Sequence, residues 1–180
     1  MINEEIHIEE IIRGCKSENR KAQEQLYRSF YRVMMSLCVR YTKNETDALE
    51  VLNSGFFKVY KNINRFNPER GSIYTWIRTI IVNNCLDFVK SRHRFQTVDT
   101  LESATDLGLQ PEVFSRINTN ELLEYIRKLP PATQAVFNLF VFEGYSHKAI
   151  ADAAGISEGT SKWHLNEARK KLKQMITTIE

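Results

Sequence analysis

The side chains best suited to chemistry with a partner lie on one arc of residues 158–175. Lysines, an amide and an indole recur there every three or four residues, and the whole segment holds five cations and two anions. Such groups bind the base edges and phosphates of a duplex, although a solvated surface helix would carry the same charges. The arc carries Thr160, Trp163, Asn166, Glu167, Lys170 and Lys171.

The residues around this arc predict a helix-turn-helix over residues 146–175. Ser146 and Ser157 are suited to cap two helices, and Gly155 between them supplies the left-handed residue that ends the first. A basic surface helix that is merely solvated would not require this capped turn between two helices. The segment therefore predicts a helix that enters the major groove of DNA. The second helix would bury Leu165, Ala168, Leu172 and Ile176.

A second constellation lies upstream, on a helix predicted to start after a Ser72 cap and to run to about residue 92. Trp76, Thr79, Asn83 and Lys90 form one stripe, and an aromatic beside cations can hold unstacked bases. The alternative is that Trp76 is simply a core residue. The loop at residues 66–72 adds backbone groups around which a flipped base could be held. The predicted buried face is Ile73, Ile77, Ile80 and Phe88.

Composition narrows the function classes. The net charge is only +3, but residues 61–94 hold seven cations against two anions, which suggests a second contact with a polyanion. The three cysteines are far apart and no signal peptide pattern precedes them, so we expect reduced thiols in a cytoplasmic protein. No apolar run is long enough to insert into a membrane. No nucleophile with its base and no ligand cluster appears, so we predict no enzyme, no metal and no cofactor.

Helical periodicity predicts an all-α protein of two small bundles joined by a flexible acidic linker. The first bundle, residues 1–94, would hold helices at about 18–42, 45–63 and 72–92. The linker would be residues 95–117, which contain no Lys or Arg up to residue 115. The second bundle, residues 118–180, would break at Pro130-Pro131 and contain the helix-turn-helix.

Two stretches carry a family resemblance. KNINRFNPERGSIYTWIRTIIVNNCLDFVKSRHR (residues 61–94) resembles the promoter-melting segment of bacterial extracytoplasmic-function sigma factors of the sigma-70 family. LPPATQAVFNLFVFEGYSHKAIADAAGISEGTSKWHLNEARKKL (residues 129–172) resembles their C-terminal DNA-binding domain.

The chain departs from the family pattern in four places. The acidic run near Asp47 has fewer carboxylates, since it reads Asp47-Ala-Leu-Glu50 and then Asn53-Ser54. Ala149 stands where Glu is usual, Ser161 where a core-facing Val is common, and Glu167 where Arg is frequent.

The resemblance implies an alternative sigma factor that binds core RNA polymerase and starts transcription at particular promoters. The implied partners are the polymerase β′ clamp helices and β flap, promoter DNA, and an anti-sigma factor, which in this family includes membrane-anchored ones. Near the melted minus-ten element it implies Phe66, Arg70, Ser72, Tyr74, Trp76, Asn83, Lys90, Arg92 and Arg94. At the minus-thirty-five element it implies Ser157, Thr160, Lys162, Trp163, Asn166, Glu167, Arg169 and Lys170. For polymerase binding it implies Asp47, Leu49, Glu50, Asn53 and Phe56.

Two other classes of protein fit the residues alone. One is a dimeric helix-turn-helix repressor or activator, with residues 1–94 as a dimerisation or sensor domain. The other is a helical adaptor that binds only protein and whose basic faces are solvated. Specific transcription with core polymerase would distinguish both from a sigma factor.

Overall fold

The computed structural model describes residues 2–92 and 119–177, and in these ranges every regular element is a helix. The predicted linker at residues 95–117, and Arg94 before it, lie outside the described residues. Contacts divide the chain into two compact units, one of residues 1–39 and 44–85 and the other of residues 40–43 and 86–180. The prediction of an all-α fold is confirmed.

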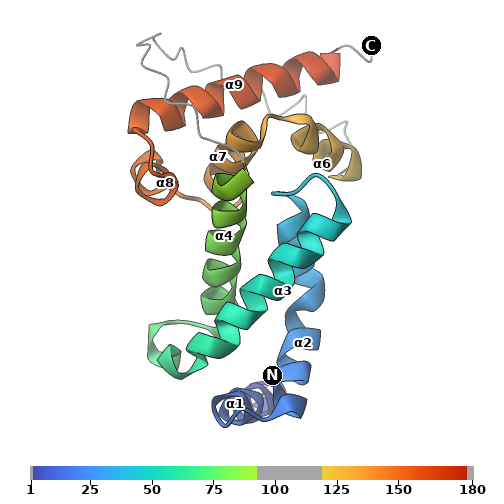
Figure 1. Cartoon of the computed structure of the whole chain (residues 1–180), viewed down its shortest axis with the longest axis vertical. Helices are drawn as coiled ribbons and strands as arrows, with labels where there is room; N and C mark the ends of the chain where they lie inside the picture. The colour runs from blue at the N-terminus through green and yellow to red at the C-terminus, as the bar shows by residue number, and fades with distance from the viewer. Residues whose placement is uncertain (1, 93–118, 178–180) are drawn as a thin grey trace. The chain divides into compact units, whose positions relative to one another are not determined.

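The first unit begins with a helical hairpin (Figure 1) that the sequence did not predict. Helix α1 (Ile2–Lys16) is followed after a three-residue turn by α2 (Arg20–Val39). Asn19 caps α2, because its side-chain oxygen accepts from the backbone N–H groups of Lys21 and Ala22. The helices approach so closely that a methyl group on Gly14 would overlap Ala22 Cβ.

Helix α3 (Glu45–Asn62) and residues 73–85 of α4 (Ile73–Arg92) complete the first core. They cross at Gly55, where an added Cβ would overlap the end of the Ile81 side chain. Close to the crossing, Asn84 Nδ2 donates to the Val51 carbonyl at 2.8 Å. This hydrogen bond gives the buried side-chain amide of Asn84 a partner. Two short 3-10 helices, η1 (Ile63–Arg65) and η2 (Pro68–Arg70), connect α3 to α4.

The buried face of α4 differs in part from the prediction. Ile73 and Ile77 are buried as expected, but Ile80 and Phe88 are only half-buried. Ile81 and Cys85 are buried instead, so the buried face turns around the helix by about 40° at each step of four from Ile73. Cys85 Sγ lies 4.0 Å from Cys38 Sγ of α2, so these two thiols are in contact inside the core.

The second unit contains α6 (Thr119–Lys128), α7 (Pro131–Val141), α8 (His147–Ala154) and α9 (Glu158–Thr177). The chain breaks at Pro130 and restarts with Pro131 in the first turn of α7, as predicted. Helix α7 is apolar and largely buried. Its neighbours contribute Ile126, Ile150 and Leu172 as fully buried side chains.

No helix in the two described ranges is both long and apolar enough to cross a membrane.

Candidate nucleic-acid interface

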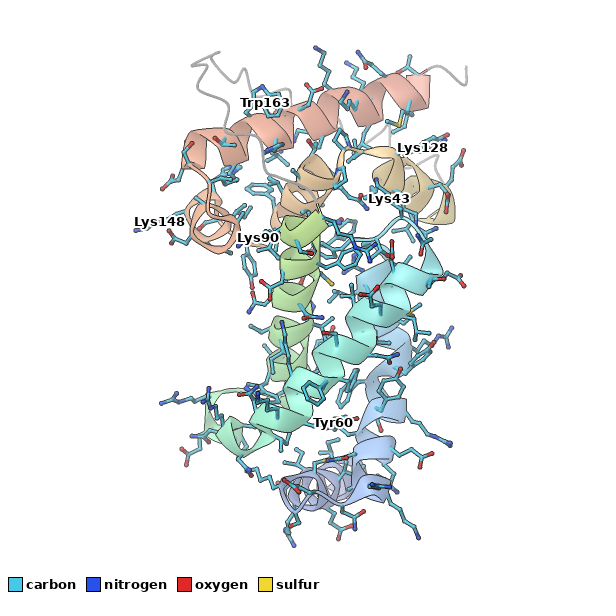
Figure 2. All side chains as sticks on the ribbon, in the orientation of Figure 1. Lys43, Tyr60, Lys90, Lys128, Lys148 and Trp163 are labelled. Atoms are coloured by element: carbon cyan, nitrogen blue, oxygen red, sulfur yellow. The ribbon has the colours of Figure 1, made fainter. Side chains whose placement is uncertain are left out.

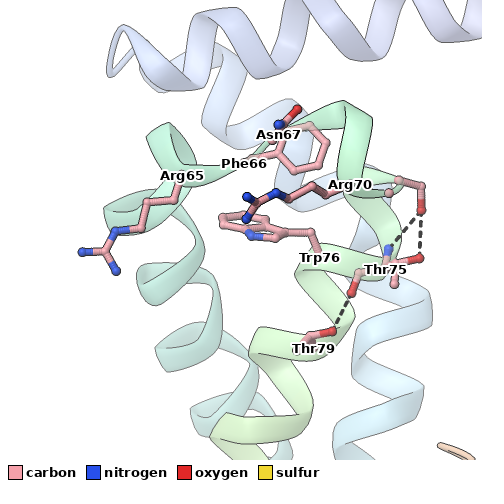
Figure 3. A pocket seen from close by; sticks show the side chains of 9 residues that line it. Arg65, Phe66, Asn67, Arg70, Thr75, Trp76 and Thr79 are labelled. Atoms are coloured by element: carbon pink, nitrogen blue, oxygen red, sulfur yellow. Dashed lines mark hydrogen bonds between the residues drawn. The ribbon is translucent and has the colours of Figure 1, made fainter.

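A pocket of about 260 Å³ opens between the loop that joins α3 to α4 and the first two turns of α4 (Figure 3). Phe66 forms its inner wall: its side chain is buried, and its ring centroid lies 5.7 Å from that of Trp76 at an interplanar angle of 58°. The indole is half-buried, so one part of Trp76 packs and another remains accessible. The lining residues are Arg65, Phe66, Asn67, Arg70, Gly71, Ser72, Thr75, Trp76 and Thr79.

The rim of the pocket is held by local hydrogen bonds. The Asn67 side chain accepts from Glu69 N at 2.9 Å, and the Ser72 hydroxyl accepts from Thr75 N at 3.1 Å and caps α4. Gly71 has φ 145°, a conformation that a residue with a Cβ rarely adopts. The loop is therefore fixed in shape before any ligand binds.

The chemistry of the pocket is aromatic and cationic. Figure 3 shows the Arg70 side chain extending toward Trp76, whereas Arg65 points away from the ring. Thr79 Oγ1 donates to the Thr75 carbonyl at 2.9 Å, which leaves lone pairs on that hydroxyl available to a ligand. A flat group could stack on the indole while donors at the rim bind its acceptors.

The structure gathers four of the predicted minus-ten residues at this pocket: Phe66, Arg70, Ser72 and Trp76. Tyr74 lies elsewhere. It is 40 % exposed on another side of α4, and its ring is 6.4 Å from Phe30 of α2. The sequence missed Thr75 as a lining residue, although its place beside Trp76 and four residues before Thr79 was the available signal.

The remaining predicted residues of this group lie further along α4. Asn83 and Lys90 are exposed, as the stripe containing Trp76 and Thr79 requires. The Arg92 guanidinium lies 4.3 Å from the centroid of the Phe88 ring in the last turn. Arg94 is outside the described residues.

The helix-turn-helix forms as predicted. Ser146 caps α8 by accepting from Ala149 N, and Ser157 caps α9 by accepting from Thr160 N at 3.0 Å. Gly155 is left-handed, with φ 71° and ψ 40°, and its N–H donates to the Ala151 carbonyl. The corner between the helices is thus fixed by backbone conformation and two caps.

The exposed arc of α9 matches the prediction with one exception. Lys162 and Lys170 are exposed, and Trp163 (Figure 2), Asn166, Glu167 and Arg169 are half-exposed. Thr160 was predicted on this arc but is only 2 % exposed. Its hydroxyl lies 2.9 Å from the Ser157 hydroxyl and completes the cap, so Thr160 cannot reach DNA directly.

Electrostatics along the arc are partly neutralised within the helix. Glu167 forms an ion pair with Lys171 at 3.2 Å, one turn further along. This pairing reduces the repulsion that a lone carboxylate would exert on phosphate. The carboxylate keeps further acceptor positions for an amino group of cytosine or adenine.

Two histidines behind the arc were not assigned a role from the sequence. His164 is buried, and its Nδ1 lies 3.0 Å from the Thr133 hydroxyl of α7. Burial lowers the pKa of His164 to about 4, although the Glu167 carboxylate opposes the shift. Burial and the nearby Lys162 and Arg169 also lower the pKa of His147. Both rings are therefore neutral at pH 7.

Helix α3 presents the predicted polymerase-binding residues differently from expectation. Leu49, Glu50 and Asn53 are exposed, Asp47 is half-exposed, and Tyr27 of α2 donates to Asn53 Oδ1 at 2.8 Å. Phe56 was predicted at this surface, but it is 1 % exposed and packs edge-on against Tyr27 in the core.

Phe57, the next residue, is the exposed aromatic of α3. Its side chain is 68 % exposed, and it follows Leu49 and Asn53 at steps of four, so the three share a face. The sequence could not choose between two adjacent phenylalanines. Their burial decides that Phe57, not Phe56, is available to a partner.

Two family models match parts of the chain. Residues 26–95 match the family model for sigma-70 region 2, and residues 119–172 match the model for sigma-70 region 4. The pocket and α3 lie in the first match, and α8 and α9 lie in the second.

The chain is also similar to curated proteins in sequence and to solved structures in fold. The chain is 27 % identical to RNA polymerase sigma factor SigV of Bacillus subtilis, over 82 % of this chain and 84 % of that protein. It is also 27 % identical to sigma factor YlaC of the same organism, over 89 % and 95 % of the two chains. In fold it resembles the sigma factor RpoE in its complex with the anti-sigma factor NepR from Bartonella quintana, with a TM-score of 0.53, 15 % identity and coverage of 87 % and 97 %. It also resembles CnrH in its complex with the cytosolic domain of CnrY, with a TM-score of 0.51, 19 % identity and coverage of 94 % and 97 %.

Proposed function

Because the chain belongs to the extracytoplasmic-function group of the sigma-70 family, we propose that its two domains act on two elements of one promoter. The protein is an alternative sigma factor, and the family consists of transcription initiation factors rather than enzymes. The finer assignment, residue by residue, rests on the geometry of the two domains.

The pocket beside Trp76 receives an unstacked base of the minus-ten element. A half-exposed indole, a buried aromatic behind it and an arginine at the rim support this role, because such groups hold a flat base and its phosphate. Stacking on an aromatic contributes about 1–3 kcal/mol, which is comparable with the cost of unstacking a base. Asn83 and Lys90 extend the same contact along the melted strand.

Helix α9 reads the minus-thirty-five element. The four residues whose side chains would reach base edges are Lys162, Trp163, Asn166 and Glu167, while Arg169 and Lys170 would contact the backbone. The caps at Ser146 and Ser157 support this role, since they fix the turn that presents α9.

The exposed face of α3 binds core polymerase. Leu49, Asn53 and Phe57 provide an apolar and amide surface with Glu50 beside it, and an exposed aromatic is a common centre of binding energy. The β′ clamp helices are the proposed partner here, and the β flap is the proposed partner of the second domain.

An anti-sigma factor is the proposed regulator. Two structural neighbours are complexes of a sigma factor with such a protein or with its cytosolic domain, which supports the class of partner. A membrane anchor on that partner is part of the same proposal. Since bacterial RNA polymerase works in the cytoplasm, the proposed site of action is cytoplasmic.

The single observation that best supports this function is the occurrence of both regions, in order, on one chain with the pocket in the first. The test mixes the full chain with purified core polymerase and assays transcription from a library of randomised promoters. We expect co-elution with core and enrichment of a bipartite promoter. Binding to a palindrome without core would instead indicate a dimeric regulator, and core binding without selected transcription would indicate an adaptor.

A permanganate footprint tests the pocket. Trp76→Ala and Asn83→Ala should each impair opening of the minus-ten element while duplex binding by the second domain stays intact. Ser29→Ala, at an exposed position of α2, is the matched control. Unchanged melting in Trp76→Ala would refute the assignment of the pocket.

A further inference from the structure

A hydrogen bond joins the first turn of α8 to the first turn of α9. His147 Nδ1 and Ser161 Oγ are 2.9 Å apart, and Ser161 is fully buried. The ring of Phe140, from α7, stacks on the imidazole with centroids 4.7 Å apart and an interplanar angle of 24°. Three helices therefore meet at one polar contact behind the DNA-facing arc.

The contact has a property that the apolar part of the core lacks, and it shares this property with the hydrogen bond between Thr133 of α7 and His164 of α9. Apolar neighbours such as Ile150 and Leu165 hold the helices together, but dispersion and burial are not directional. A hydrogen bond weakens steeply when its angle changes, so it fixes one relative orientation. If α9 moved away from His147, the buried Ser161 hydroxyl would lose its hydrogen-bond partner, which costs free energy. This cost favours the orientation of α9 in which the two side chains stay in contact.

The charges around His147 favour the neutral ring that this contact needs. Burial is the largest cause that lowers the pKa of His147, and Lys162 and Arg169 of α9 lower it further. Glu158 raises it. A neutral imidazole adds no third cation beside Lys162 and Arg169. Both partners can then exchange one hydrogen bond whichever tautomer is present.

We propose that His147 and Ser161 are positioning residues, which set the angle at which α9 presents its N-terminal half to the minus-thirty-five element. This inference rests on the proposed role of α9 in reading that element. It assigns a task to the buried Ser161 and to the ring of His147, which it contacts.

Because α9 is long, a small change in its angle displaces the side chains near Ser161. Leu172 is the buried residue of α9 that lies furthest from Ser161, eleven residues or roughly 16 Å away at 1.5 Å per residue, and Leu165 and Ala168 between them are buried as well. A tilt of about 5° around Leu172 would move the Ser161 turn by roughly 1.4 Å. Lys162 and Trp163 would move with it, and a hydrogen bond to a base edge tolerates only a few tenths of an ångström.

The experiment uses holoenzyme made from the full chain and core polymerase, with promoters randomised in the minus-thirty-five element. Ser161→Ala removes the hydroxyl, and His147→Phe keeps a ring against Phe140 but removes the hydrogen bond. His147→Asn is the conservative variant, because its side-chain amide places a hydrogen-bonding atom where Nδ1 stood. Asp152→Asn, at an exposed position of α8, is the matched control.

We expect the preference for selected over randomised sequences to fall about tenfold in Ser161→Ala and in His147→Phe, the discrimination typical of one base contact. The double variant should lose no more than either single variant. His147→Asn should retain most of the preference, and Asp152→Asn all of it. Thermal unfolding of each full-length variant is measured in parallel, and selections are run well below each midpoint.

The outcomes distinguish failure of the proposed function from failure of the positioning role of His147 and Ser161. If wild-type holoenzyme selects no minus-thirty-five sequence, the proposed function itself fails. If wild type selects a sequence and the variants keep the same preference with only a lower midpoint, the contact is structural and the positioning role is overturned. Additive losses in the double variant would overturn it as well.

Discussion

Burial of His164 makes the stability of the second domain depend on pH. Its ring is 3 % exposed and is held by the Thr133 hydroxyl, and its pKa falls from 6.5 to about 4. In the unfolded chain the same ring takes up a proton below pH 6.5. Between these two values the unfolded state binds more protons than the folded state, so the free energy of unfolding decreases as the pH falls.

The size of the effect follows from the two pKa values. With 6.5 for the unfolded and about 4 for the folded chain, linkage removes about 1 kcal/mol from the free energy of unfolding at pH 6. At pH 5 the loss is about 2 kcal/mol, and it approaches its limit of roughly 3 kcal/mol below pH 4. The stability is fully present above pH 6.5.

The assay is urea unfolding of the full chain from pH 7 to pH 5, followed by fluorescence. The chain contains two tryptophans, and a Trp76→Phe background leaves Trp163, whose ring centroid is 4.9 Å from that of His164, as the reporter. The comparison protein is His164→Asn, which can still bond Thr133 but does not titrate. His147, which shifts in the same direction, is present in both proteins and cancels in the difference.

We expect wild type to lose about 2 kcal/mol more than His164→Asn between pH 7 and pH 5. Parallel losses in the two proteins would refute the reasoning, as would a folded-state pKa of His164 near 6.5 in an NMR titration.

Three further predictions concern the corner, the groove-facing arc and the α3 surface. Gly155→Ala should lower the free energy of unfolding by about 1–2 kcal/mol, because φ is 71° and Ala rarely adopts this left-handed conformation. Nothing lies within 4 Å of the new methyl, so the cost comes from the backbone alone. Gly155→Asn should cost less, and urea unfolding measures both variants. Lys162→Ala should change the minus-thirty-five preference in a promoter selection, whereas Lys170→Ala should weaken binding to all sequences and reduce the salt slope by about one; equal preference in wild type and Lys162→Ala would contradict this. Phe57→Ala should weaken binding to core polymerase by about 1–2 kcal/mol in a titration, with Ser54→Ala as the exposed control, and an unchanged affinity would exclude Phe57 from the interface.

Much of the fold could be predicted from local pattern. The turn residues Ser146, Gly155 and Ser157 occupy the positions the sequence predicted, because caps and left-handed glycines act within a few residues of themselves. The break at Pro130-Pro131 is of the same kind. Helix α1 was missed, although Ile8, Ile11, Ile12 and Cys15 recur at steps of three and four among its acidic residues, and Ile11 and Cys15 are the ones that the fold buries.

The candidate site was predicted less completely, for a physical reason. Phe66, Arg70, Ser72 and Trp76 were identified by type and spacing, and the structure gathers them at one pocket. Tyr74 precedes Trp76 by only two residues, but two residues of a helix correspond to a rotation of about 200°, which places Tyr74 on another side of α4. Phe56 and Phe57 differ in the same way. Thr160 shares the direction of its arc, but it is buried where its hydroxyl meets Ser157 in the helix cap.

The sequence by itself determined the helical class, the helix-turn-helix and the two segments that resemble sigma regions, because these depend on periodicity, caps and motifs along the chain. Only the tertiary structure decided which of two adjacent side chains faces a partner, since burial depends on helices that are distant in sequence. The same holds for Ser161: from the sequence it was a departure from an apolar position, and the fold supplies its partner in His147, fourteen residues earlier.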